Sequence, residues 1–233
     1  MVSHLQYNID QIKNMLQCMA DLAGLSLGRS IDSLFGPDPV MAQRVIDDDK
    51  AINSFEIDID AAVYRRLALE RPNENDLRLL LSIQKINICL ERIGDHAVNI
   101  AESVIMLSSS PDPKSFYELP EMAKLTNAMY HDVTECFFAG DAGRAQEILE
   151  RDDAIDALNA AVLASVKEKV LAGDEHFESA LELVRISRNL ERVADLSTNI
   201  AEQAIFCLQG QIVKHHAQSD VMAADKATAP AIA

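Results

Sequence analysis

Apolar residues recur along residues 83–107 at alternating spacings of three and four, which is the period of one face of an α-helix. This run contains Ile83, Ile86, Leu90, Ile93, Ala97, Ile100, Val104 and Leu107. A second run lies 100 positions later and contains Leu183, Ile186, Leu190, Val193, Ser197, Ile200, Ala204 and Cys207. We call each run an apolar seam, and each predicts a long helix that packs lengthwise in a bundle. The predicted core contains Ile86, Leu90, Ile93, Ile100, Ile186, Leu190, Val193 and Ile200.

Turn-forming residues cluster only at wide intervals along the chain. These clusters lie near residues 36–39, 71–74, 108–113, 140–141 and 172–174. The segments between them are too long for strands and predict six helices of about 25 to 35 residues each. Asp38, Asp141 and Asp174 follow or interrupt such clusters, and we expect each to cap the start of the next helix.

The two halves of the chain share a repeated sequence. Residues 90–102 align without gaps on residues 190–202 and share Leu-Glu-Arg, the following Asp and Asn-Ile-Ala-Glu. The preceding segments also correspond, 45–53 with 148–156 at an offset of 103. We therefore predict an all-α fold of two tandem three-helix bundles, residues 1–110 and 114–210, related by internal duplication and packed as one body. Residues 211–233 have no hydrophobic period, and we expect them to form a disordered tail.

The charge of the chain restricts its partners. With 37 acidic and 21 basic residues, the net charge is -16, which would repel nucleic acid and anionic membrane surfaces. We expect no nucleic-acid partner and only indirect membrane contact through other proteins. The first residues lack the features of a signal peptide, no apolar run approaches about 18 residues, and the four cysteines are not spaced as a disulfide or zinc framework. These features predict a cytoplasmic protein.

Acidic and amide residues line the side of each seam helix that faces away from the seam. In the first repeat, four such residues lie within an arc of about 80° around the helix axis, and four equivalent residues do so in the second repeat. The two sets are Glu91, Asp95, Asn99 and Glu102, and Glu191, Asp195, Asn199 and Glu202. A solvated surface would explain one such stripe. However, the acidic identities recur in both copies while neighbouring seam residues vary, which indicates a function for these oxygens beyond solubility.

The helix before each seam adds a second pair of oxygen ligands one turn apart. Asp49 is paired with Asn53, and Asp152 is paired with Asp156. If the two helices of a repeat lie side by side, four oxygen ligands converge, a set that suits Mg²⁺, Mn²⁺ or iron. We expect such a site on the bundle surface, open to solvent or another protein. Asn53 lacks a carboxylate charge, so the second site is predicted to be the stronger.

Three neighbouring residues have simpler interpretations. His96 is rotated by about 100° from Asp95, so we expect it on the surface or between helices and not among the ligands. Arg92 and Arg192 follow the motif acids in both copies. We expect them to neutralise these acids or a neighbouring helix, without a catalytic role.

The motif residues resemble the PhoU family of accessory proteins of bacterial phosphate-specific transport. The resemblance is carried by Glu-Arg-Ile-Gly-Asp-His-Ala-Val-Asn-Ile-Ala-Glu at 91–102, its copy at 191–202 and Asn-Asp-Leu-Arg-Leu-Leu-Leu at 75–81, and it extends over about residues 5–210. It implies two three-helix bundles and metal clusters of iron, zinc, manganese or magnesium held by paired acidic motifs. Carried over, the motifs give the candidate ligands Asp49, Asn53, Glu91, Asp95, Asn99, Asp152, Asp156, Glu191, Asp195 and Asn199. Asn53 stands where the family pattern has an acid.

The resemblance also implies how the protein acts. We expect a non-enzymatic signalling adaptor, a homodimer that restrains the phosphate-starvation response by contacting a phosphate ABC transporter ATPase and a phosphate-sensing histidine kinase. The sequence shows no combined nucleophile, base and oxyanion donor and no glycine-rich phosphate loop. A di-iron oxidase would need inward-facing Glu-x-x-His motifs, and none is present. A purely structural helical scaffold with acidic surface residues is the other alternative, and metal analysis would separate it from the adaptor.

Overall fold

The computed structural model describes residues 8–108, 118–174 and 176–214, and these residues contain helices and no strand. The helices are α1 (Ile9–Phe35), α2 (Pro39–Leu69), α3 (Glu74–Leu107), α4 (Glu118–Ala139), α5 (Ala142–Leu149), α6 (Asp152–Ala172) and α7 (Phe177–Gln209). The all-α prediction of six long helices is confirmed. One detail differs, because the fifth predicted helix is interrupted at Glu150 and Arg151 and so forms α5 and α6.

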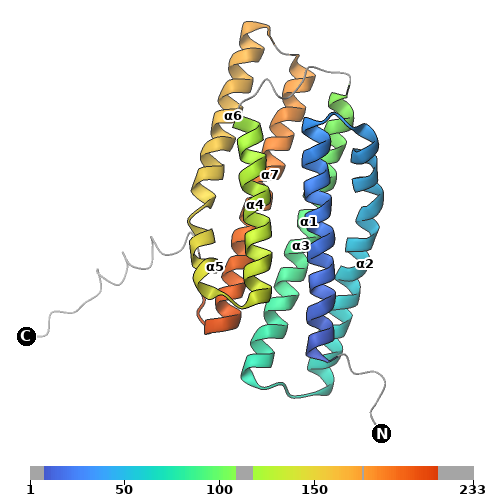
Figure 1. Ribbon diagram of the computed structural model, residues 1–233, viewed down its shortest axis with the longest axis vertical. Helices are drawn as coiled ribbons and strands as arrows, with labels where there is room; N and C mark the ends of the chain where they lie inside the picture. Colours follow the sequence, from blue (N-terminus) through green and yellow to red (C-terminus); the bar gives the residue numbers. More distant parts are fainter. Residues whose placement is uncertain (1–7, 109–117, 175, 215–233) are drawn as a thin grey trace, which may run out of the picture.

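The helices form two bundles that lie side by side with their long axes roughly parallel (Figure 1). One bundle contains α1, α2 and α3, and the other contains α4, α5, α6 and α7. The two bundles meet along α3 and α7 and, on the other side, along α1 and α4. The predicted tandem bundles therefore pack together as one body.

Helices α3 and α7 run antiparallel in a constant register. Three side-chain contacts define it: Ser82 Oγ donates to the Gln203 carbonyl at 3.3 Å, His96 Nδ1 lies 2.8 Å from Asn189 Oδ1, and Ser103 Oγ donates to Glu182 Oε2 at 2.6 Å. This register places Arg92 opposite Arg192. The duplicated halves are thus related by a pseudo-two-fold axis that passes between these two residues.

Both apolar seams lie in the hydrophobic core. All eight predicted core residues are buried, with at most 2% of their surface exposed. On the other side of the molecule, Tyr130 is fully buried and donates its hydroxyl to the Ala20 carbonyl at 2.5 Å. A Cβ atom at Gly24 would lie only 2.8 Å from Tyr130 Cε1, so the missing side chain allows α1 and α4 to approach. The period-3.6 pattern therefore identified the buried face of α3 and α7 correctly.

Two of the three predicted helix caps are confirmed. Asp38 accepts hydrogen bonds from the backbone amides of Val40 and Met41, and Asp141 accepts one from the amide of Arg144 at 3.1 Å. Asp174 is wrong as a cap, because α7 begins only after His176. Gly173 ends α6 instead, in a left-handed conformation with φ +79° that glycine adopts without strain.

The chain continues past α7 for five described residues, 210–214. Gly210 ends α7 with φ +69°, and residues 211–214 are not helical. Val213 packs against the core. The rest of the predicted disordered tail, residues 215–233, lies outside the described residues. In the described part of the chain, no helix is both long and apolar enough to cross a membrane.

Candidate functional site

The candidate site of the first repeat lies at a close approach between α2 and α3. A Cβ atom at Gly94 would lie 3.0 Å from Ile52 Cδ1 and 3.2 Å from Asp49 Oδ1. The absence of a side chain at Gly94 therefore lets α2 place the Asp49 carboxylate directly against α3. Glu91 lies one turn earlier on α3, so the two predicted acidic helices do lie side by side.

The carboxylates at this approach interact electrostatically. The pKa of Glu91 is raised, first by burial and then by the negative charges of Asp95, Glu56 and Asp49. The pKa of Asp49 is also raised by burial and by Asp95, against a hydrogen bond from Asn53 that lowers it. The neighbouring negative charges thus make the carboxyl groups of Glu91 and Asp49 harder to ionise. A bound cation would relieve this repulsion.

Glu56 belongs to this group of acidic residues, because its negative charge also raises the pKa of Glu91, although the sequence analysis did not select it. It lies one turn after Asn53 on α2 and therefore points to the same side of the helix. At the repeat offset of 103, its counterpart in the second half is Asn159, so the duplication gave no signal for it. The spacing of three residues between Asn53 and Glu56, which places both on one side of a helix, was the sequence feature that could have indicated Glu56.

The hydrogen bonds of the first site leave two oxygens free. Asn53 Nδ2 donates to Asp49 Oδ2 at 2.8 Å. Asp49 Oδ1 and Asn53 Oδ1 are both buried and have no hydrogen-bond partner among the described residues. A buried unsatisfied polar atom costs about 1–3 kcal/mol, and an oxygen-coordinated cation would satisfy both. The donor chemistry of the first site therefore fits a hard metal ion.

These donors are not preassembled as a metal site. Within the described residues, no three or more His, Cys, Asp and Glu side chains are grouped so as to hold a metal ion. A cation would thus require rotation of the acidic side chains toward it. Their partial exposure on the bundle surface leaves room for such rotation.

The second repeat differs because an arginine neutralises its acids. Arg192 Nη1 donates to Asp195 Oδ2 at 2.7 Å, and Arg192 Nε lies 3.8 Å from Glu191 Oε2. The pKa of Glu191 is raised by burial, lowered by Arg192 and raised by Asp195 and Asp156. Asp152 is the first residue of α6 and is only 2% exposed. The predicted neutralising role is confirmed for Arg192, whereas no ion pair of Arg92 is found among the described residues.

The two predicted asparagine ligands lie in different surroundings. Asn99 Oδ1 accepts a hydrogen bond from Arg185 Nη2 of α7 at 2.8 Å, and the same nitrogen donates to Glu102 Oε2 at 2.6 Å. Asn99 is therefore engaged at the contact between α3 and α7. Asn199 is exposed. The polar stripe is thus divided, with Glu91 turned toward α2, and Asn99 and Glu102 toward α7.

His96 lies between helices, as expected. Its ring nitrogen Nδ1 contacts Asn189 Oδ1 across the interface of α3 and α7. Burial lowers the pKa of His96, partly opposed by this hydrogen bond. The counterparts of the two residues across the pseudo-two-fold axis are Leu196 and Cys89, which are both buried. The histidine therefore has an interface position that the duplication does not repeat.

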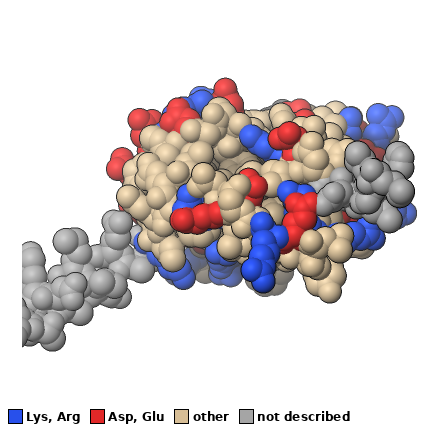
Figure 2. All heavy atoms as spheres, turned by 90° about the horizontal axis from the view of Figure 1, so that it is seen from below, with Lys and Arg blue, Asp and Glu red and all other residues tan. Residues whose placement is uncertain are grey.

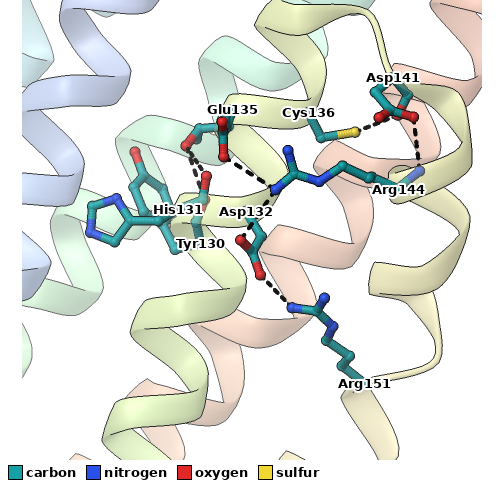
Figure 3. Close-up of polar contacts among 9 residues, drawn as sticks. Tyr130, His131, Asp132, Glu135, Cys136, Asp141, Arg144 and Arg151 are labelled. Carbon is teal, nitrogen blue, oxygen red and sulfur yellow. Dashed lines mark hydrogen bonds and ion pairs between the residues drawn. The ribbon is translucent and has the colours of Figure 1, made fainter.

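A second polar cluster, not found from the sequence, joins α4 to α5 and to the turn between α5 and α6 (Figure 3). Arg144 Nη2 lies 3.1 Å from Glu135 Oε2 and 3.5 Å from Asp132 Oδ1, while Arg151 pairs with the other oxygen of Asp132. Cys136 Sγ contacts the Asp141 carbonyl at 2.7 Å. These contacts attach α4 to the chain on both sides of α5. They explain how the interruption of the fifth helix is held in place.

A cavity between α3, α7 and the segment after α7 is too small for a typical organic substrate. Its volume is about 110 Å³, and Lys85, Glu202, Phe206, Val213 and Lys214 are among its lining residues. Ligand pockets for drug-sized molecules usually occupy about 300–1,000 Å³. The cavity also lies apart from the acidic pairs. It offers no support for an enzymatic site.

Comparison with known families and proteins gives one consistent result. The PhoU domain matches the chain twice, over residues 16–104 and 119–204. The "Phosphate-specific transport system accessory protein PhoU homolog" of Aquifex aeolicus is 32% identical over 207 residues, covering 89% of this chain and 94% of that protein. The corresponding PhoU of Escherichia coli is 28% identical over 212 residues, covering 90% and 88%.

Solved structures show the same similarity. The crystal structure of PhoU from Pseudomonas aeruginosa superimposes with a TM-score of 0.83 at 28% identity, covering 87% of this chain and 97% of that one. The phosphate transport system regulatory protein PhoU from Streptococcus pneumoniae gives a TM-score of 0.81 at 27% identity, covering 88% and 97%. The similarity therefore includes both bundles and their relative placement.

Proposed function

The chain belongs to the PhoU family, and from this premise we propose that it is a non-enzymatic, metal-binding regulator of phosphate uptake. In this proposal it restrains the phosphate-starvation response by contacting a phosphate ABC transporter ATPase and a phosphate-sensing histidine kinase. The observation that carries the proposal is the match of the PhoU domain to both repeats. Relatives that align with this chain over most of their length are named accessory proteins of phosphate-specific transport.

The site geometry supports action by contact. Apart from the buried Asp152, the acidic residues are spread along long helices and are at least partly exposed, so another protein can reach them. Among the described residues, the cavity between α3, α7 and residues 212–214 has a volume of only about 110 Å³. A regulator that acts by binding other proteins needs no large pocket.

We expect the tagged chain to co-purify with the ATPase of its host's phosphate transporter. The net charge of -16 favours a basic partner surface, so the recovered amount should fall as salt increases. Quantitative immunoblotting at low and high ionic strength measures this, with an ABC ATPase for another substrate as the control. Equal recovery of both ATPases, or of neither, would contradict the proposed contact.

The proposal assigns metal binding to the acidic residues of both repeats. In the first repeat, the ion would be held by Asp49, Asn53, Glu56, Glu91 and Asp95. In the second repeat, it would be held by Asp152, Asp156, Glu191 and Asp195. Iron, zinc, manganese and magnesium are the candidate metals. A bound ion would supply positive charge that links the two helices of each site. The asparagines Asn99 and Asn199 would remain at the edge of the sites.

The structure changes the expected ranking of the two sites. In the first site, Glu56 supplies a carboxylate that compensates for the uncharged Asn53. In the second site, the positive charge of Arg192 offsets one negative charge. We therefore expect Asp95→Ala to remove more bound metal than Asp195→Ala. We also expect Arg192→Ala to raise the metal content, because it frees Asp195.

Elemental analysis of freshly purified protein measures these differences. Asp58→Ala is a matched control, because Asp58 is an exposed acid on α2 that lies on the opposite side of the helix from Asp49. Far-ultraviolet circular dichroism should show unchanged helicity for every variant. The same metal content in the wild type and in Asp95→Ala/Asp195→Ala would refute the assignment.

A further inference from the structure

The residues that follow α7 lie against both repeats. Ile212, Val213 and Lys214 line the cavity of about 110 Å³ together with Lys85 of α3 and Glu202, Gln203 and Phe206 of α7. We call residues 211–214 the strap. The surface under it, formed by Lys85, Glu202, Gln203 and Phe206, we call the Phe206 site. The strap therefore covers a surface that is built from both halves of the duplicated chain.

The Phe206 site has an aromatic centre with single charges around it. Lys85 Nζ lies 5.7 Å from the centre of the Phe206 ring, within the range of a cation–π contact. Gln203 Oε1 is buried and accepts no hydrogen bond from the described residues. Figure 2 shows the end of the molecule at which α7 terminates, and there basic and acidic side chains form small separate groups. A segment that fits this site therefore needs a large apolar side chain, with no more than single charges beside it.

The strap is held by one side chain. Val213 packs against the hydrophobic core, whereas Gln211, Ile212 and Lys214 are exposed, Ile212 to 80%. Among the residues that the structure describes, no hydrogen bond or ion pair joins the strap to the bundle. The cavity beneath the strap also leaves its contact surface incompletely packed. Detachment of the strap therefore breaks no helix and no hydrogen bond of the described residues.

The duplication shows that the fold itself does not require this cover. The residues equivalent to the Phe206 site lie 100 positions earlier or later in the chain and are Arg185, Glu102, Ser103 and Met106. A basic and an acidic residue recur there, and Arg185 Nη2 donates to Glu102 Oε2 at 2.6 Å. Met106, however, is 64% exposed, although it takes the position of Phe206. A bundle that tolerates an exposed Met106 has no structural need for a strap over Phe206, which indicates another role for the strap.

We propose that the strap is autoinhibitory and occupies a docking site for an extended segment of a partner protein. The partner segment carries a large apolar residue at the position of Val213, followed by a basic residue at the position of Lys214. The larger side chain fills the cavity that valine leaves open, which adds dispersion contacts that the strap lacks. The basic residue takes the place of Lys214, which lines the same cavity as Glu202. The inference rests on the proposed function, in which the chain acts by contact, and adds a surface, a partner chemistry and a control by the chain itself.

A short peptide tests whether the strap blocks the Phe206 site. The probe is a fluorescein-labelled peptide of residues 209–214 that carries Val213→Phe, and it is titrated with the full chain in fluorescence anisotropy. In the wild type, the attached strap competes with the peptide at a high effective concentration. Val213→Asp in the full chain puts a carboxylate against the apolar core and should release the strap, because burying an unpaired charge is strongly unfavourable. We expect this variant to bind the peptide with a Kd at least about tenfold lower than that of the wild type.

The matched control is Gln211→Asp, which makes the same change of charge at an exposed strap residue that does not line the cavity. It should leave the Kd at the wild-type value, whereas adding Phe206→Ser to Val213→Asp should abolish the gain. Thermal unfolding curves identify any variant that fails to fold. The inference is overturned if Val213→Asp and the wild type bind the peptide equally, or if neither binds it up to about 1 mM. Either result would leave co-purification of the wild type with the transporter ATPase unaffected, so the two failures are distinguishable.

Discussion

Replacing Leu90 or Leu190 by alanine is expected to lower the free energy of unfolding by about 2–5 kcal/mol. Both side chains are completely buried, at equivalent positions in the centres of the two seams. Each contributes to a core shared by several helices, so alanine would leave a cavity that long, rigidly packed helices cannot easily close. Urea unfolding followed by far-ultraviolet circular dichroism measures the change.

The exposed leucines of the same chain provide the control. Leu69 and Leu171 are 68% and 78% exposed, and alanine at either position should change the free energy of unfolding by no more than about 0.5 kcal/mol. If Leu90→Ala or Leu190→Ala costs less than about 1 kcal/mol, that residue does not belong to the core. The comparison tests burial itself, because the chemical change is the same at all four positions.

The fold was predictable because its main determinants are local and repeated. The spacing of Ile86, Leu90 and Ile93 defines a helix face, and the copy 100 positions later shows that the same unit occurs twice. Two faces of this kind in one chain have few ways to be buried other than in bundles. The interruption at Glu150 and Arg151 was not predictable in the same way. It depends on ion pairs between Arg144, Arg151 and residues of α4, which the sequence pattern does not reveal.

The candidate site was predictable only in part, because helical spacing defines a face but not its neighbours. The sequence analysis correctly put Asp49 and Glu91 on adjacent helices, where the negative charge of Asp49 contributes to the raised pKa of Glu91. It could not show that Asn99 is engaged by Arg185, since that contact depends on the register of α3 against α7. It also could not distinguish Arg192, which pairs with Asp195, from Arg92, which occupies the equivalent position.

Deleting the gene for this chain is expected to switch on phosphate-starvation genes while phosphate is abundant. In the proposed function, contact with the transporter and the sensor kinase holds the system in its phosphate-replete state. Loss of the chain removes that contact without changing the external phosphate concentration. The effect should therefore be much larger than that of any single surface substitution, which leaves most of the contact area intact.

A promoter reporter for a phosphate-starvation gene, read in phosphate-rich medium, tests the proposed function most directly. The account predicts high reporter expression in the deletion strain and its return to the low wild-type level when the intact gene is supplied on a plasmid. A complementing gene with Leu90→Ala shows whether a destabilised fold also fails to restrain the response. If the reporter stays silent in the deletion strain, and neither the ATPase nor the kinase co-purifies with the chain at low ionic strength, the regulatory account is contradicted and a purely structural role replaces it.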